Sequence, residues 1–213
     1  MRATRKLATA LAAAVILPLS CQWPESREGG GSAVLASHRH PVTSYQAWLA
    51  RTLDPSPTAV ANQLRRARTG LVPSEIDHVA EVLIRECARY DLAPDLVLAL
   101  IEVESSGYNF ARSRADALGL MQLQPPTAEF VARRAGVPWY GRDTLFEPGS
   151  NVRLGVAYLR QLVDRYDSVS TALAAYNWGP TRISAMIARG EPVPGVYTQR
   201  VLRAFDRRQE RGA

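Results

Sequence analysis

Glu104 occupies the position in this sequence best suited to acid–base chemistry. It ends an apolar segment that starts at Leu92, has Pro94 near its beginning and continues as LVLALIEVE. Proline fits the first turn of a helix, and a segment that is apolar on nearly all sides predicts a buried helix. The C-terminal end of a helix carries partial negative charge, and burial disfavours ionisation, so both raise the pKa of a carboxyl group there. We therefore predict that Glu104 stays protonated near neutral pH, as a general acid must.

The residues after Glu104 distinguish this prediction from a solvated helix end, which is the ordinary place for a lone glutamate. Short motifs follow in a fixed order: Glu104-Ser105, Ser113, Gly119-Leu120-Met121-Gln122, Pro125 and Thr127-Ala128. Their order and spacing resemble the catalytic core of the lytic transglycosylases, the lysozyme-like enzymes that cleave peptidoglycan. The matching unit is the soluble lytic transglycosylase (SLT) catalytic domain of glycoside hydrolase family 23.

The second half of the chain adds to this resemblance, which covers about residues 75–206. Its matching pieces are Asn151-Val152-Arg153-Leu154-Gly155, Ala172-Leu173-Ala174-Ala175-Tyr176-Asn177, Gly179-Pro180 and Tyr197. Two positions depart from the family pattern. Val193 stands where an acidic residue often precedes the tyrosine, with Glu191 the nearest carboxylate, and Asp116 replaces a small residue, usually glycine. The first departure concerns how sugar is held on one side of the cleft, and the second indicates an altered loop shape.

A single carboxyl group is expected to carry the reaction. Many glycosidases use two carboxylates, but Glu102 is two residues from Glu104 and points to another side of the helix, while Asp95 lies at its far end. The resemblance implies that Glu104 protonates the glycosidic oxygen between MurNAc and GlcNAc while the N-acetyl carbonyl stabilises the positive centre. Deprotonated Glu104 then takes the proton of the C6 hydroxyl, which closes a 1,6-anhydro ring without water. The intramolecular attack replaces a bimolecular one.

The resemblance also assigns the residues that would contact substrate. They are Ser105, Ser113, Gly119, Met121, Gln122, Tyr176, Asn177 and Tyr197. Hydroxyl and amide groups bind sugar hydroxyls and acetamides without adding charge. Within this set we expect Ser105 to orient the acid, because no histidine is paired with it as a serine nucleophile would require. Met121 is expected to form a flexible wall of the pocket.

Two alternatives to the transglycosylase remain open. A hydrolytic muramidase would share the fold and Glu104 but would use water, and a non-catalytic peptidoglycan-binding or assembly protein would not need the acid. The presence of Glu104 argues against the second alternative. No metal or organic cofactor is implied. The expected partners are peptidoglycan glycan strands, and the protein is expected to be a monomer that binds no nucleic acid.

Helices must position these groups. Helical patterns cover residues 58–68, 74–90, 94–104, 126–135, 148–166, 169–176, 181–189 and 195–208, and no segment alternates with a period of two. We place Ser74 at one N-cap and Gly70 at one C-cap, and we expect the loop 137–147 to pack its aromatic residues. Gly155 inside a helix indicates close helix contact. The fold class is mostly α: a lysozyme-like, multi-helix single domain over residues 58–210, preceded by a flexible N-terminal signal and linker.

Residues 1–20 have the pattern of a secretory signal peptide. Arg2, Arg5 and Lys6 precede an apolar run over residues 7–19, which is too short for the roughly 20 residues of a membrane span. Cys21 follows as in a bacterial lipoprotein, although Pro18 stands where an aliphatic residue is usual. We predict lipidation of Cys21, with ordinary cleavage after Ala36 as the alternative. The protein is therefore expected in the periplasm, and a lipidated Cys21 would attach it to a membrane, such as the outer membrane.

Residues 21–57 read as a flexible linker, with Gly29-Gly30-Gly31-Ser32 at its centre. His38 and His40 lack the further ligands that a metal site needs.

The formal charge of +6 suits an anionic cell-wall polymer or membrane surface, and no basic-aromatic motif points to nucleic acid. Cys87 is the only other cysteine, so a disulfide framework is absent and we expect Cys87 to be buried.

Overall fold

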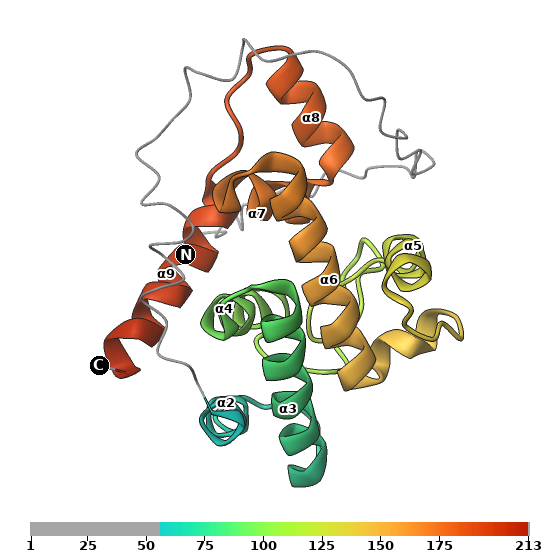
Figure 1. Cartoon of the computed structure of the whole chain (residues 1–213), viewed down its shortest axis with the longest axis vertical. Coiled ribbons are helices and arrows are strands. Elements are labelled where there is room, and N and C mark those ends of the chain that lie inside the picture. Colours follow the sequence, from blue (N-terminus) through green and yellow to red (C-terminus); the bar gives the residue numbers. More distant parts are fainter. Residues whose placement is uncertain (1–55, 213) are drawn as a thin grey trace, which may run out of the picture.

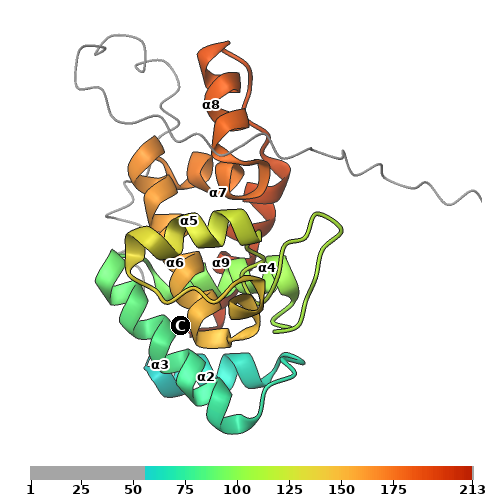
Figure 2. The same cartoon turned by 90° about the vertical axis from the view of Figure 1, so that its right-hand side faces the viewer.

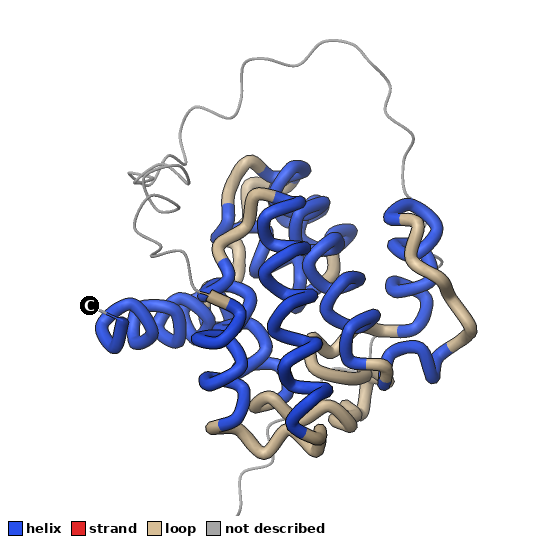
Figure 3. Tube along the Cα trace, turned by 60° about the horizontal axis from the view of Figure 1, so that its bottom comes forward, coloured by secondary structure: helices blue, strands red, loops and turns tan. Residues whose placement is uncertain are grey.

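The computed structural model describes residues 56–212, which fold mostly into helices (Figures 1 and 3). The elements are α2 (Pro57–Arg65), α3 (Pro73–Tyr90), α4 (Pro94–Ser105), α5 (Pro125–Ala135), the 3-10 helix η2 (Arg142–Phe146), α6 (Pro148–Tyr166), α7 (Val169–Trp178), α8 (Pro180–Ala188) and α9 (Val196–Gly212). Within this part of the chain the only extended pairing is two isolated bridges in the loop after α4. The predicted mostly α fold is confirmed. The predicted signal peptide, Cys21 and nearly all of the linker lie outside the described residues.

Helix α4 lies at the centre of the molecule, as its apolar sequence predicts. Figure 1 places it between α3 and α9, and all its residues from Leu96 to Ile101 are at most 2% exposed. Pro94 is in its first turn, as expected, and its last turn holds no basic residue. The helix that carries Glu104 is therefore fixed by packing on most of its surface.

Helices α3 and α6 form a second pair, which continues into α7 and carries α5 and η2 on its flank (Figures 1 and 2). Gly155 of α6 lies against Met121, and a Cβ atom at Gly155 would be 2.3 Å from the Met121 sulfur. The predicted close contact at Gly155 is confirmed, and it ties α6 to the loop that follows α4. Among the described residues, no helix is long and apolar enough to cross a membrane.

Two predicted helix caps are wrong. Helix α3 begins with Pro73 after an N-cap at Val72, whose backbone N–H donates to the Glu75 side chain, so Ser74 lies inside the first turn. Helix α2 already ends at Arg65, and Gly70 belongs to the following loop. Gly70 has φ +74°, and a Cβ atom there would lie 3.0 Å from the ring of Tyr108. The need for glycine at position 70 is explained by this contact in the loop, and not by a helix end.

The loop between α5 and α6 packs part of its aromatic content, and a short 3-10 helix occupies its second half. Trp139 and Phe146 pack against the core, whereas Tyr140 is 85% exposed, so the expected packing holds for two of the three aromatic residues. Cys87 is 1% exposed, as predicted, and burial raises the pKa of its thiol well above the usual value.

Candidate active site

Glu104 is half-buried in the last turn of α4. Burial raises the pKa of its carboxyl group from 4.5 to about 7, against the opposing effects of a hydrogen bond from Tyr197 and the positive charge of Arg200. Its helix ends at Ser105 with no basic residue in the last turn to offset the partial negative charge of the free carbonyl groups. A carboxyl group with this pKa is present in both its protonated and its ionised form near pH 7.

Two tyrosines from distant parts of the chain lie around this carboxyl group. Tyr197, in the first turn of α9, is buried and its hydroxyl donates to Oε1 of Glu104. Tyr176, in α7, donates its hydroxyl to the backbone carbonyl of Met121 over 2.8 Å. Burial and, after it, the charge of Glu104 raise the pKa of both phenols well above the usual value. Both tyrosines therefore remain neutral donors beside the acid.

Ser105 connects the end of α4 to the loop that follows. Its hydroxyl lies 2.8 Å from the carbonyl of Leu120 and 3.1 Å from that of Ile101, and it accepts the N–H of Gly107. These contacts occupy the hydroxyl within the protein and fix the loop relative to Glu104. The geometry agrees with an orienting role for Ser105, and its assignment to substrate contact stays a prediction.

Asn151 of α6, fully buried, holds the same loop from the other side. Its side chain accepts the N–H of Met121 and donates to the carbonyls of Leu118 and Leu145, at 2.8 to 3.0 Å. A Cβ atom on Gly119 would lie 2.2 Å from the Asn151 amide and 2.3 Å from the Leu145 carbonyl, and Gly119 has φ +79°. Gly119 is therefore required sterically, whatever its part in binding substrate.

Gln122 adopts the left-handed conformation, with φ 49°, which is uncommon for a residue with a side chain. Its amide nitrogen donates to the carbonyls of Ala111 and Gly119, at 3.0 and 2.9 Å. Both amide hydrogens are then used inside the loop, and the amide oxygen remains for a ligand N–H or O–H. Strained residues that are held in this way occur preferentially at functional sites.

The other predicted contact residues differ in how accessible they are. Ser113 is exposed in a turn, where its oxygen accepts the N–H groups of Ala115 and Ala117. Asn177 is exposed at the end of α7. Met121 has no exposed surface, so its side chain packs against α6 and does not form the expected pocket wall.

Within residues 56–212, no second carboxylate acts on the pKa of Glu104. Glu102 is paired with Arg207 and Arg208 of α9, and Asp95 lies at the other end of α4, where Gln209 donates to it. Of the two departures from the family pattern, Asp116 has φ 60°, a left-handed conformation that glycine adopts without strain, and its carboxylate pairs with Arg142. Glu191 is exposed and paired with Arg189. Each of these four carboxyl groups thus has a partner other than Glu104.

Sequence reasoning missed Arg200 as a neighbour of the acid and underestimated Asn151. Arg200 follows Tyr197 by three residues on α9, a spacing that puts both on one helix face, and its charge lowers the pKa of Glu104.

Among the described residues, no group of three or more His, Cys, Asp or Glu side chains could hold a metal ion. Two cavities of the described part of the chain are lined by other residues, on α3, α5, α6 and the loops after α3 and α5.

Known proteins share both the sequence and the fold of this region. Residues 81–191 match the transglycosylase SLT domain family. The chain is 40% identical over 92 residues to a transglycosylase of Enterobacteria phage PRD1, covering 43% of this chain and 31% of that protein. It is 34% identical over 146 residues to membrane-bound lytic murein transglycosylase C of Photorhabdus laumondii, covering 56% of this chain and 40% of the relative.

A putative soluble lytic murein transglycosylase of Haemophilus influenzae is 35% identical over 100 residues, which cover 46% of this chain and 17% of that protein. Among solved structures, the 70-kDa soluble lytic transglycosylase of Escherichia coli has a TM-score of 0.54 at 20% identity, over 79% of this chain and 32% of that one. At this identity the structural match concerns the fold alone. The chain spans less than half the length of each of these proteins.

Proposed function

Because the chain belongs to the transglycosylase SLT domain family, we propose that it is a peptidoglycan lytic transglycosylase with Glu104 as its only acid and base. Its reaction is cleavage of the β-1,4 bond between MurNAc and GlcNAc with formation of 1,6-anhydro-MurNAc. The observation that carries the proposal is one half-buried carboxyl group with a pKa of about 7, with no second carboxylate beside it among the described residues.

Such a group can give a proton and take one back in the same catalytic cycle. In its protonated form Glu104 donates to the glycosidic oxygen, the bond from C1 of MurNAc to that oxygen breaks, and GlcNAc leaves with a hydroxyl group. The N-acetyl carbonyl of MurNAc stabilises the positive charge at C1. The carboxylate then accepts the C6 hydroxyl proton as O6 bonds to C1, so that both the proton count and the charge of the enzyme are restored.

The surroundings of Glu104 suit both halves of this cycle. The Tyr197 hydroxyl donates to Oε1, which stabilises the ionised form after proton transfer and fixes the direction of the carboxyl group. Tyr176, the Ser105 hydroxyl and the Asn151 amide hold the loop of residues 118–123 at a fixed distance from the acid. In the proposal, the amide oxygen of Gln122 and the side chains of Ser113 and Asn177 bind sugar hydroxyl and acetamide groups.

Product analysis tests the reaction. Purified peptidoglycan is digested with the protein, and the fragments are identified by mass spectrometry. We expect anhydro-MurNAc ends, each lighter by one water than a reducing end. Reducing ends alone would overturn the proposal in favour of a hydrolytic muramidase, and binding without any cleavage would favour a non-catalytic wall-binding protein.

The role of Glu104 is tested by Glu104→Gln, with Glu102→Gln as the matched control on the same helix. Removing the only general acid and base should lower turnover by at least about 100-fold while binding to peptidoglycan persists. Glu102 pairs with arginines of α9 and is partly exposed, so its substitution should change turnover little. Turnover by Glu104→Gln close to that of the unaltered protein would contradict the single-acid mechanism.

The site of action is a further part of the proposal. We place the protein in the periplasm, exported by residues 1–20 and tethered through a lipidated Cys21, on the strength of the sequence pattern alone. A single acyl chain gives only reversible membrane binding, so a second lipid or contact would be needed for stable anchoring. Metabolic labelling with a fatty acid should label the unaltered protein and not Cys21→Ser. An unlabelled protein would instead favour cleavage after Ala36.

A further inference from the structure

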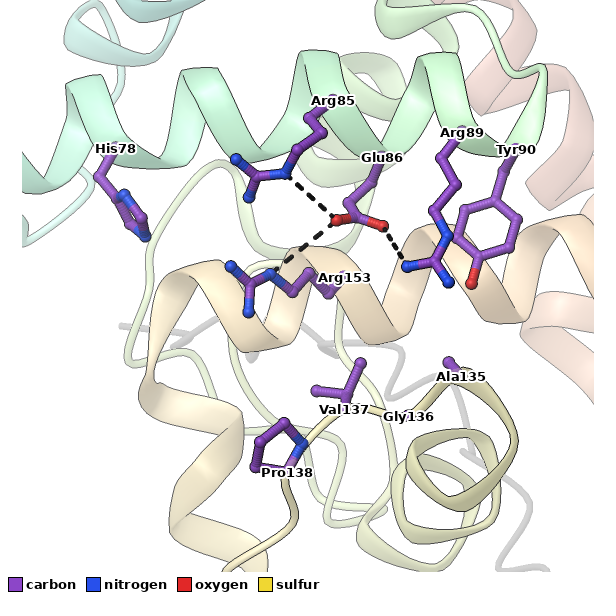
Figure 4. Close-up of a pocket in the computed structure, with 10 residues that line it drawn as sticks. All are labelled: His78, Arg85, Glu86, Arg89, Tyr90, Ala135, Gly136, Val137, Pro138 and Arg153. Atoms are coloured by element: carbon purple, nitrogen blue, oxygen red, sulfur yellow. Dashed lines mark ion pairs between the residues drawn. The ribbon is translucent and has the colours of Figure 1, made fainter.

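A cavity of about 320 Å³ lies between α3, α6 and the end of α5, lined by none of the residues around Glu104 (Figure 4). Arg153 contributes to it from α6. Arg153 and Gly155 are two positions apart, and such positions point to nearly opposite sides of a helix. This cavity and the contact of Gly155 with Met121 therefore lie on different faces of α6. The proposed reaction uses none of the side chains that line the cavity.

Positive charge converges on one wall of this cavity. Figure 4 shows the side chains of Arg85, Arg89 and Arg153 directed toward the carboxylate of Glu86. Their nitrogen atoms lie 3.6, 3.7 and 4.0 Å from its oxygens, and the Glu86 side chain is only 7% exposed. Three guanidinium groups against one carboxylate leave two positive charges uncompensated at this wall.

The three arginines also keep their hydrogen-bond donors. At 3.6 to 4.0 Å the contacts with Glu86 are ion pairs and are too long for hydrogen bonds. Arg89 additionally lies over the ring of Tyr90, at 5.3 Å. A guanidinium group offers five N–H donors in a planar fork that matches a carboxylate or a phosphate. The buried Glu86 thus gathers donors that an incoming anion can use.

The facing wall is small and apolar. It consists of Ala135, Gly136, Val137 and Pro138, from the end of α5 and the chain after it (Figure 4). A ligand that fits both walls has an anionic group with a small apolar group beside it, as at the carboxyl end of a peptide that ends in alanine. A bare phosphate would use only the arginine wall.

A second cavity of about 480 Å³ continues from the first, sharing Arg89, Tyr90 and Ala135 with it. This second cavity is lined by charged side chains of both signs, among them Arg134, Arg160 and Asp164. The carboxylate-binding part of the site is therefore the first cavity.

We propose that the first cavity binds the carboxyl end of a short peptide with a small, apolar last residue, and that the peptide continues toward the second cavity. The carboxylate lies against Arg85, Arg89 and Arg153, and the last side chain lies against Val137 and Pro138. This identification of the peptide rests on the proposed function: its source is the peptide stem of peptidoglycan. The wall polymer is then held at a second place, away from the bond that is cut.

Binding of N-acetyl-D-alanyl-D-alanine to the full chain tests this site, with the C-terminal amide of the same dipeptide and inorganic phosphate as comparison ligands. Titration is followed by calorimetry or by NMR. We expect the free carboxylate to bind at least about tenfold more tightly than the amide, because charged hydrogen bonds are lost with the amide. Equal binding of acid and amide, no binding of either, or tighter binding of phosphate would overturn the assignment.

Arg153→Gln should weaken dipeptide binding by at least about tenfold. Arg133→Gln is the matched control: it removes the same charge from the exposed end of α5, where Arg133 pairs with Glu129 and does not line either cavity. Equal losses in both variants would indicate unspecific attraction and contradict the site. A protein that binds the dipeptide but yields no anhydro products contradicts the proposed reaction alone, whereas the reverse result contradicts this site alone.

Discussion

At the scale of single residues, the site depends on how one carboxyl group is protonated. Burial of Glu104 raises its pKa, and Tyr197 and Arg200 partly oppose that rise. The general acid must be protonated when substrate binds, so kcat/KM should fall as the pH rises through about 7. The two neighbours thereby set the upper limit of the active pH range.

Tyr197→Phe should move this alkaline limit to higher pH. The Tyr197 hydroxyl stabilises the ionised carboxyl group and so lowers its pKa, and its loss raises the pKa further. The measurement is kcat/KM against pH, and Tyr140→Phe, at an 85% exposed position, is the control that should leave the profile unchanged. A limit that stays in place or moves to lower pH would show that the hydrogen bond does not act on the acid.

The same pKa makes Glu104 a source of pH-dependent stability. A pKa raised from 4.5 to about 7 on folding means that the folded protein holds this proton more tightly than the unfolded chain. The group's stabilising contribution is complete below pH 4.5 and disappears as the pH rises through about 7.

The effect of Glu104→Gln on the free energy of unfolding should therefore differ between pH 4 and pH 8. Relative to the unaltered protein, the variant should be more stable at pH 8 than it is at pH 4, by up to about 3 kcal/mol. Urea unfolding at the two pH values measures the difference. Glu102→Gln, which removes a carboxylate paired with arginines, should show no such gain at pH 8. An equal effect of Glu104→Gln at both pH values would contradict the raised pKa.

At the scale of secondary-structure elements, the loop after α4 depends on one amide of α6. Asn151 satisfies two carbonyls and one N–H in a fully buried position, so it replaces regular secondary structure where the chain has none. The loop conformation in turn fixes Gln122 and the carbonyl that receives the Tyr176 hydroxyl.

Asn151→Ala should lower the free energy of unfolding by about 2–5 kcal/mol, because three buried backbone groups lose their partner. Urea unfolding measures the loss. The control is Asn62→Ala on α2, where the asparagine is exposed and accepts only from Arg65, so the change should stay within about 0.5 kcal/mol. A similar small change at Asn151 would mean that the loop is held by other contacts.

At the scale of the whole molecule, three of the six net positive charges lie in residues 1–20, and the remaining charge of +3 still favours association with an anionic polymer. Three of the positive groups converge at the cavity beside α3, which none of the residues around Glu104 lines. In the proposed function, two contact regions on different elements would hold the polymer while one bond is cut.

Binding of the Glu104→Gln variant to purified peptidoglycan should weaken as the NaCl concentration rises from about 0.05 to about 0.5 M, because salt screens exposed charges. Co-sedimentation measures the bound fraction. The neutral oligosaccharide chitotetraose is the comparison ligand, and its binding should depend little on salt. Equal salt dependence for both ligands would show that net charge does not contribute to recognition of the polymer.

Much of the fold could be predicted from the sequence, and a candidate acid could be chosen from it, because both depend on local patterns. The apolar run before Glu104 predicts a buried helix, and Gly155 predicts a tight contact, since helical periodicity and the absence of a side chain are visible in a linear sequence. The predicted cap at Ser74 is wrong because the helix begins one residue earlier, at Pro73. The predicted cap at Gly70 is wrong because α2 already ends at Arg65, and the glycine instead avoids the ring of Tyr108 in the following loop.

Only the folded chain brings Tyr197 to Glu104, Asn151 to the loop of residues 118–123, and Arg153 to Arg85 and Arg89. These partners are tens of residues apart in the sequence, and no periodicity relates them. Helix packing sets which of them meet, and burial at those meeting points sets the pKa of Glu104. The sequence therefore points to Glu104 as the candidate acid, while tertiary packing determines its protonation and brings together the arginines of the cavity beside α3.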